Sequence, residues 1–145
     1  MVSTTFASVT RIAAPIEAVW AVMTDHARYA RWGSAKQVTI ERAGVPAPNG
    51  LGAIRCFHAG PRKVREEVIA WDEPTRMTYR LNSQQLTRHY ESDMVLHDDD
   101  GFTVLEWSST FVPRLPGTSR VVRRVYERAV AGFAAGIKAE AEAAS

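Results

Sequence analysis

Hydrophobic and polar residues alternate along most of the chain before residue 113, the pattern of strands that bury one face. Turn signals separate these segments at short intervals: AGPR at 59–62, DEPT at 72–75, a polar NSQQLT loop at 82–87 and DDDG at 98–101. A parallel connection needs a dozen or more residues, so the short connections favour an antiparallel meander. The predicted strands are residues 3–12, 35–42, 53–58, 63–71, 76–82, 89–97 and 102–112.

Three other segments have a helical period. The first follows Pro15, which suits a first helical turn, and the second is predicted over 26–32, with Asp25 as its N-cap and Gly33 as its stop. A long helix is predicted over 119–143. The apolar face of the first helix is Ile16, Val19, Trp20 and Met23, and that of the long helix is Val122, Val125, Tyr126, Ala129, Phe133 and Ile137.

Glycine and proline mark two places where regular packing is interrupted. The segment AGVPAPNGLG, residues 43–52, contains two prolines and three glycines, and is predicted to be an irregular loop and the most mobile part of the chain. Gly132 and Gly136 flank the apolar stripe of the long helix. Their missing side chains leave room for a cavity between helix and sheet.

This order of elements predicts an α+β fold, in which a curved antiparallel sheet of about six to seven strands wraps around a long C-terminal helix. Two short helices follow the first strand. One face of such a sheet must be covered, and the long helix is the element that can cover it. A length of 145 residues fits a single domain, 1–145.

Charge and composition limit the classes of partner and the cellular location that we expect for this chain. Eighteen basic and sixteen acidic side chains leave a formal charge of +2, which does not suggest nucleic-acid binding. The single cysteine excludes an internal disulfide and suits a reducing compartment. The chain has no signal-peptide pattern at its start and no run of eighteen apolar residues, so we expect a cytoplasmic protein without stable membrane insertion. Monomer and homodimer both remain open.

Several stretches resemble the SRPBCC superfamily, the START-like, helix-grip group that includes polyketide cyclase/dehydrase-type proteins. They are IAAPIEAVWAVMTDHARYARW, GLGAIR, VREEVIAWDEPTRMTYRL, HYESDMVL and GFTVLEWSSTF. The resemblance implies a deep, mostly apolar cavity between sheet and long helix that holds a hydrophobic small molecule. Aromatases, cyclases, lipid carriers and hormone receptors share this fold, so the fold alone does not select a function.

One acid stands out on the predicted inner face of residues 63–71, where alternation groups Glu66 with Val64, Val68 and Ala70. A buried carboxylate needs a partner, and Arg55 is the candidate; the resemblance implies that both point inward. Alternation alone leaves the direction of Arg55 open. The pair could orient a polar group of the ligand, or Glu66 could act as general acid or base beside a carbonyl held by Arg55. A structural cross-strand ion pair is the alternative.

Alternation also predicts three apolar sets that face the cavity: Leu105, Trp107, Ser109 and Phe111; Met77, Tyr79 and Leu81; and Tyr90, Ser92, Met94 and Leu96. Aromatic rings with a polar tip suit a polycyclic or phenolic guest, although ordinary core is the alternative for each of them. The predicted ligand-binding residues are Trp32, Arg55, Phe57, Glu66, Tyr79, Tyr90, Trp107, Phe111 and Phe133.

No motif indicates a metal or cofactor. Cys56 and His58 lack further ligands at a recognisable spacing, and residues 98–109 lack the Gly and Glu of a calcium loop. His89 is either a base at the cavity mouth or an exposed strand-end residue. Four arginines, at 120, 123, 124 and 128, make the long helix basic, which indicates solvated surface or, alternatively, an acidic membrane or partner.

The functional expectation is binding of a hydrophobic or aromatic small molecule, lipid or polyketide-like, by a carrier or sensor. The alternative is a polyketide cyclase/dehydratase-type enzyme that uses Arg55 and Glu66.

Overall fold

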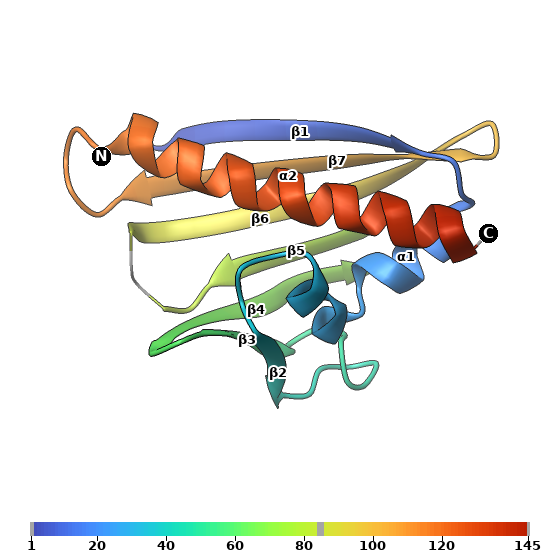
Figure 1. The fold of residues 1–145 in the computed structure, drawn as a ribbon, viewed down its shortest axis with the longest axis horizontal. Helices are drawn as coiled ribbons and strands as arrows, with labels where there is room; N and C mark the ends of the chain where they lie inside the picture. Colours follow the sequence, from blue (N-terminus) through green and yellow to red (C-terminus); the bar gives the residue numbers. More distant parts are fainter. Residues whose placement is uncertain (1, 84–85, 145) are drawn as a thin grey trace.

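A computed structural model of the chain describes residues 2–83 and 86–144. It contains one antiparallel sheet in the order β1-β7-β6-β5-β4-β3-β2, and α2 lies across one face of this sheet (Figure 1). The strands are β1 (Thr4–Ile12), β2 (Gln37–Arg42), β3 (Ile54–Ala59), β4 (Arg62–Asp72), β5 (Arg76–Leu81), β6 (Thr87–Asp99) and β7 (Phe102–Pro113). The helices are α1 (Ile16–Met23), the 3-10 helix η1 (His26–Arg31) and α2 (Ser119–Ala144).

This architecture confirms the predicted fold class, a helix-grip fold with a curved sheet around a C-terminal helix. From β2 to β7 each strand pairs with the next in the sequence, as short turns require. The first strand pairs instead with the last, so that β1 joins the sheet beside β7. The loop predicted at 82–87 includes residues 84–85, which lie outside the described residues.

The inner face of the sheet and the underside of α2 form the core. All three predicted inward sets lie on this face, and Met77, Met94 and Leu105 have no exposed surface. The buried residues of α2 are Val122, Val130, Ala134, Ile137 and Ala141. Two members of the predicted stripe are therefore wrong as core residues, because Val125 and Ala129 are exposed and border a cavity instead of packing on the sheet.

A β-bulge in β4 changes which side chains face inward. Val68 pairs with Tyr79 but Trp71 pairs with Met77, so one extra residue lies in β4 between them. The predicted inner face is therefore wrong beyond Val68, since Trp71 and not Ala70 shares the face of Glu66. Trp71 packs edge-on against Trp20 of α1, with ring centroids 5.0 Å apart.

The loop at 43–52 is irregular, as predicted, but it is closed on itself. Val45 and Leu51 exchange two backbone hydrogen bonds of 2.9 Å, and Gly50 N donates to Pro46 O. A Cβ at Gly50 would overlap the Val45 carbonyl carbon, so the two sides of the loop touch. Backbone contacts therefore close the loop, and its mobility stays a prediction.

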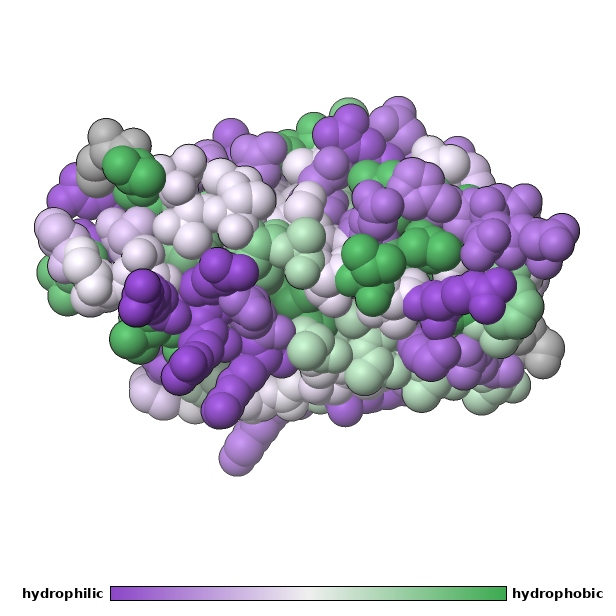
Figure 2. Space-filling model, turned by 90° about the horizontal axis from the view of Figure 1, so that it is seen from above, coloured by the Kyte–Doolittle hydropathy of each residue, from purple (hydrophilic) through white to green (hydrophobic). Residues whose placement is uncertain are grey.

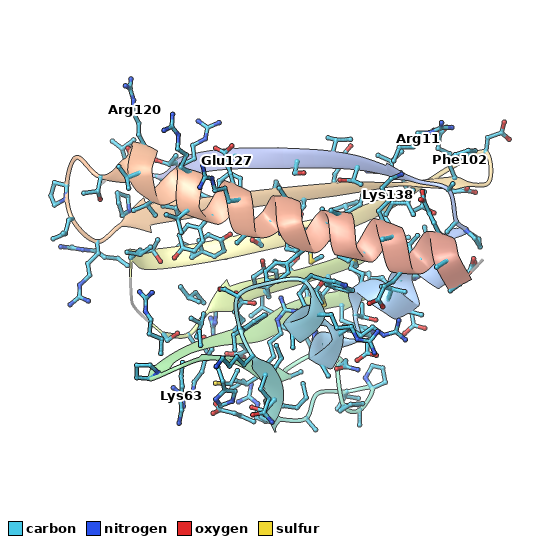
Figure 3. All side chains as sticks on the ribbon, viewed as in Figure 1. Arg11, Lys63, Phe102, Arg120, Glu127 and Lys138 are labelled. Carbon is cyan, nitrogen blue, oxygen red and sulfur yellow. The ribbon has the colours of Figure 1, made fainter. Side chains whose placement is uncertain are left out.

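The end of the molecule at the β6–β7 hairpin is closed by local contacts. Asp100 and Gly101 both have positive φ, which confirms the predicted hairpin turn. The Arg11 guanidinium lies 3.8 Å from the centre of the Phe102 ring, and Lys138 Nζ donates to Arg11 O at 2.8 Å (Figure 3). Open space between sheet and helix is found nearer the start of α2.

Candidate ligand cavity

A cavity of about 520 Å³ lies between α2 and strands β3 to β6. This volume is within the range of small-molecule sites, which hold ligands in mostly apolar clefts with few polar groups. The lining residues are Trp32, Gly33, Ser34, Ala35, Phe57, Ala59, Val64, Glu66, Tyr79, Leu81, Tyr90, Val125, Tyr126, Arg128, Ala129, Val130, Gly132 and Phe133. Apolar and aromatic side chains therefore dominate the wall.

The cavity has a buried inner wall and an exposed mouth. Phe57, Tyr79 and Tyr90 of the inner wall are at most 8% exposed, whereas Ser34 and Arg128 at the mouth are exposed. Arg128 belongs to the basic first half of α2, and strongly hydrophilic side chains gather at this end of the molecule (Figure 2). Among the described lining residues, Arg128 is the one cation.

Close backbone approach between η1 and α2 shapes one side of the cavity. A Cβ at Gly136 would overlap Trp32 Cγ, so the Trp32 indole occupies the space that this glycine leaves. Gly33 in turn approaches the Phe133 ring, which a Cβ at this glycine would meet at 2.8 Å. The room that the sequence suggested at Gly136 is thus filled by a side chain of the protein.

Glu140 of α2 binds the η1 region to the helix. Its carboxylate accepts from Trp32 Nε1 at 3.2 Å, from Arg28 Nη1 at 3.0 Å and from Arg31 Nη1 at 3.1 Å. Asp25 stands at the N-cap position of η1 but makes no side-chain cap, because its carboxylate pairs with Arg28 Nε at 2.8 Å. The expected capping by Asp25 is therefore wrong, and contacts with α2 hold the segment.

Arg55 and Glu66 stand directly opposite each other on β3 and β4 and form an ion pair. Arg55 Nε and Nη2 both approach Glu66 Oε1, at 3.0 and 2.8 Å. The Arg55 side chain is 1% exposed and that of Glu66 13% exposed. Burial raises the pKa of Glu66, an effect that Arg55 opposes. Burial alone would lower the pKa of Arg55, but Glu66 raises it, so the guanidinium stays charged.

His26, fully buried in η1, is the third member of this cluster. Arg55 Nη1 lies 3.1 Å from His26 Nδ1, and His26 Nε2 lies 2.9 Å from Asn49 O. Arginine can only donate, so Nδ1 accepts and the ring proton is on Nε2, which donates to the loop carbonyl. Burial, and the charge of Arg55, lower the pKa of His26 to about 3. The imidazole is therefore neutral and links the 43–52 loop to Arg55.

Aromatic rings enclose the Arg55 guanidinium. Its central carbon lies 4.4 Å from the centre of the Tyr29 ring, 4.7 Å from that of Tyr79 and 5.2 Å from that of Phe57. These distances are typical of cation–π contacts, which offset part of the cost of burying the charge. The Tyr29 hydroxyl donates to Met23 O at 2.7 Å, which holds η1 against α1.

The structure separates the predicted site residues into two groups. Trp32, Phe57, Glu66, Tyr79, Tyr90 and Phe133 line the cavity. Arg55, Trp107 and Phe111 are buried behind its wall: Trp107 stacks on Phe133 at 6.3 Å between ring centroids, and Phe111 packs against Phe6, Tyr90 and Tyr126. The hypothesis that Arg55 itself holds a ligand carbonyl does not fit this placement.

Sequence reasoning missed His26 and Arg128. The one available signal for His26 was its place among apolar residues of a short helix, and nothing in the sequence links it to Arg55, since 29 residues separate them. Arg128 was interpreted only as part of a basic surface. Its position beside Val125 and Ala129 at the cavity mouth depends on how α2 is rotated against the sheet.

The hydroxyl groups of the inner wall are largely committed to the protein. Tyr90 OH donates to Ser109 Oγ at 3.0 Å, and Ser109 Oγ lies 2.6 Å from Ser92 Oγ. Burial raises the pKa of Tyr90 to about 12 and raises the pKa of Tyr79 well above its usual value, so both phenols are neutral. Glu66 is thus the one carboxylate that the described cavity wall offers to a ligand.

The other histidines considered as candidates, His89 and His58, are not among the residues that line the cavity. His89 is exposed, with Nε2 3.8 Å from Glu91, and is not among the lining residues. His58 Nε2 lies 2.8 Å from Thr39 Oγ1. Over residues 2–83 and 86–144, no group of three or more His, Cys, Asp and Glu side chains is arranged to hold a metal ion.

Comparison with known proteins agrees with this architecture. A family model described as polyketide cyclase / dehydrase and lipid transport matches residues 3–142. A sequence comparison with curated proteins gave no significant match. In the described part of the chain, no helix combines the length and apolar composition needed to cross a membrane.

Solved structures share the fold at low sequence identity. A START superfamily protein from Mycobacterium smegmatis has a TM-score of 0.78 and 13% identity, over 97% of this chain and 99% of that one. Norcoclaurine synthase from Thalictrum flavum, a point mutant with a transition-state analogue, has a TM-score of 0.76 and 15% identity, over 97% and 94%. The di-domain ARO/CYC StfQ of the steffimycin biosynthetic pathway has a TM-score of 0.77 and 13% identity, over 97% and 51%.

The family match covers nearly the whole chain, and the structure has the helix-grip architecture and cavity that the family implies. The chain therefore belongs to the polyketide cyclase / dehydrase and lipid transport family of the SRPBCC superfamily.

Proposed function

We propose that this protein binds a hydrophobic or aromatic small molecule, lipid or polyketide-like, in the cavity between sheet and α2, and acts as a carrier or sensor. The observation that carries the proposal is the cavity of about 520 Å³ with its aromatic and aliphatic wall. An apolar occupant that fills this cleft removes its aromatic and aliphatic wall from water, which is favourable, so a hydrophobic ligand is favoured.

The proposal favours binding over catalysis because the wall offers few reactive groups. General acid–base chemistry needs a titratable group within hydrogen-bond reach of the reacting atom. Glu66 is the one such carboxylate on the described wall, and one of its oxygens is engaged by Arg55.

Native mass spectrometry of the purified protein tests the proposal, together with thermal denaturation against a panel of fatty acids, sterols and polycyclic aromatics. We expect a copurifying apolar molecule, or a rise in Tm with at least one class of the panel, because a ligand that binds only the folded state stabilises it. Absence of both results would refute the proposed function.

The alternative function is a polyketide cyclase/dehydratase-type enzyme. It is favoured by Glu66, whose pKa is raised by burial and which lies on the same wall as Tyr79 and Tyr90. Of the similar solved structures, StfQ is named as an ARO/CYC protein and the Thalictrum flavum protein as a synthase. Both likenesses are below 25% identity and support this alternative only through the shared fold.

A direct comparison separates the two functions. If the protein is an enzyme, Glu66→Gln lowers kcat by a hundredfold or more on a substrate that the wild type converts, while binding of that substrate changes much less. If it is a carrier, candidate polyketides bind and are recovered unchanged from both proteins.

A further inference from the structure

At the inner end of the cavity the carboxylate of Glu66 faces the cavity, whereas Arg55, the cation that neutralises it, is buried behind the wall. Glu66 lines the cavity, whereas Arg55 is 1% exposed and absent from the wall. Both contacts between the two side chains use Oε1 of the carboxylate. The second carboxylate oxygen therefore keeps its capacity to accept a hydrogen bond from a molecule in the cavity.

The pair geometry keeps Glu66 ionised at neutral pH. The Arg55 guanidinium is buried among aromatic rings, and its other polar contacts are the neutral imidazole of His26 and the neutral hydroxyl of Tyr29. If Glu66 took up a proton, the guanidinium charge would be left buried without its counter-charge, which costs several kcal/mol. The carboxylate thus remains an acceptor, and it cannot itself donate to a ligand.

The net charge of the pair decides which ligand group fits. An anionic group against Glu66 would meet like charge in a low-dielectric site, because the compensating cation behind the wall lies farther from the ligand than the carboxylate does. An ammonium group would add a third buried charge to a pair that is already balanced. A neutral donor completes the hydrogen bonding of the carboxylate and adds no charge.

Resting on the proposed function, we propose that the inner end of the cavity selects ligands that carry a neutral hydrogen-bond donor, an alcohol or a phenol, directed at Glu66. Ligands that would place a carboxylate at this end are rejected. An anionic group at the opposite end of a ligand lies at the mouth, where Arg128 provides a cation.

The hydrogen bonding of the inner-wall tyrosines is consistent with selection of a ligand donor. The hydroxyl proton of Tyr90 is committed to Ser109, which leaves an acceptor oxygen. The Tyr79 hydroxyl is hydrogen-bonded with Ser92. At the Tyr90 oxygen, whose proton is already donated to Ser109, a ligand donor is therefore accommodated better than a ligand carbonyl would be.

A matched naphthalene series tests the proposal by titration calorimetry or ligand fluorescence at pH 7. In this series 2-naphthol has a neutral donor, 2-methoxynaphthalene keeps the oxygen without the donor, and 2-naphthoate carries an anion. We expect 2-naphthol to bind at least about tenfold more tightly than 2-methoxynaphthalene, as hydrogen bonds to charged groups allow. Because 2-naphthoate could bind reversed at the mouth, its affinity is also measured in Arg128→Ala, where we expect it to be the weakest of the three.

The protein offers a matched pair of double variants. In Arg55→Met with Glu66→Met, both charges of the inner pair become apolar, and the preference for 2-naphthol over 2-methoxynaphthalene should fall to within about twofold. The control is Arg80→Met with Glu67→Met, which removes a neighbouring Arg–Glu pair from the outer face of the same sheet. This control should keep the wild-type preference.

The wild-type protein also provides a measurement that needs no variant. A crystal structure with 2-naphthol bound should place the ligand oxygen within about 3.2 Å of the Glu66 carboxylate. An outward-facing hydroxyl would overturn the proposal, as would equal binding of 2-naphthol and 2-methoxynaphthalene by the wild type. Those outcomes leave the proposed function intact, whereas failure of every compound, in this series and in the apolar panel, refutes the proposed function itself.

Discussion

Arg55 is the residue on which the electrostatics of the interior depend. It is paired with Glu66, bonded to His26 and enclosed by the rings of Tyr29 and Tyr79. Each of these contacts compensates part of the cost of a buried charge. The three polar members come from η1, β3 and β4, so the cluster links three elements of the fold.

Removal of one charge should cost more stability than removal of both. We expect Glu66→Gln to lower the free energy of unfolding by about 3 kcal/mol, because it leaves the Arg55 charge buried without its counter-ion. Arg55→Met with Glu66→Met should cost clearly less than this single variant. Urea denaturation measures both.

A neighbouring acid on the outer face of the sheet provides the control for this comparison, because its arginine partners are half-exposed and not buried. Glu67→Gln changes a carboxylate on the outer face of β4, where Arg42 and Arg80 are half-exposed, and should cost about 1 kcal/mol or less. If the double variant proved less stable than Glu66→Gln, the role assigned to the ion pair would be wrong.

His26 should make stability depend on pH in the acid range. Its folded pKa of about 3 lies below the ordinary value of 6.5, so between these values the unfolded chain binds a proton that the folded chain does not. The stabilisation is complete above pH 6.5, decreases as the pH falls, and is lost near pH 3. By pH 5 the loss amounts to about 2 kcal/mol, at about 1.4 kcal/mol per pH unit.

His26→Gln isolates this effect, because a glutamine can still accept from Arg55 and donate to Asn49 O but does not titrate. The difference in unfolding free energy between wild type and variant should change by about 2 kcal/mol between pH 7.5 and pH 5, in favour of the variant in acid. The contribution of Glu66 is common to both proteins and cancels. A constant difference would show that His26 is protonated in the folded state.

At the scale of elements, the close contact between the η1 region and α2 depends on a glycine of the helix, Gly136. Gly136 lets the Trp32 indole lie directly on the helix, and Glu140 holds the same indole by its Nε1. Periodicity predicted both helices, but it could not show that this glycine receives a tryptophan. The β4 bulge is similar, because one inserted residue reverses the face of every later side chain in the strand.

Two glycine substitutions on α2 should have opposite effects. Gly136→Ala places a Cβ on top of Trp32 Cγ and should destabilise the protein by about 1–3 kcal/mol through overpacking. Gly132→Ala meets only Trp32 O, at 3.4 Å, and should be neutral or stabilise by up to about 1 kcal/mol, because alanine favours helix. Thermal denaturation measures both. Equal effects would contradict the assigned position of Trp32.

For the molecule as a whole, the defining feature is that the first half of α2 does not pack fully against the sheet. Its first half spans a cavity, so Val125 and Ala129 remain uncovered although the helical pattern assigns them to the apolar face.

Filling the cavity with a larger side chain should abolish ligand binding without unfolding the protein. Ala129→Phe adds a ring at the cavity wall and should abolish the ligand-induced rise in Tm, while the ligand-free protein stays folded, because the ring enters existing space. Ala131→Phe is the control: it lies on the exposed side of α2, is not a lining residue, and should keep the full ligand-induced shift. Equal ligand responses would place the binding site elsewhere.

The sequence alone determined the elements and their order, because strand alternation, helical period and turn residues are local properties. Every predicted strand and helix is present, and the ends differ by a few residues, as for β2, which begins at Gln37 instead of residue 35. Six of the nine predicted ligand-binding residues line the cavity: alternation placed Glu66, Tyr79 and Tyr90 on the inner face, and the helical period placed Phe133 on the apolar stripe of the long helix.

Only the tertiary structure determined the features that depend on contacts between different segments of the chain. The rotation of α2 and the docking of Trp32 on Gly136 follow from packing between elements that are far apart in the sequence, and the bulge in β4 follows from how this strand pairs with β5. For the same reason, alternation could pair Arg55 with Glu66 but could not show that the arginine lies behind the wall, bonded to His26, while the carboxylate faces the cavity. Burial is a property of the assembled layers, so which member of a charged pair meets the ligand is settled when sheet, short helices and α2 come together.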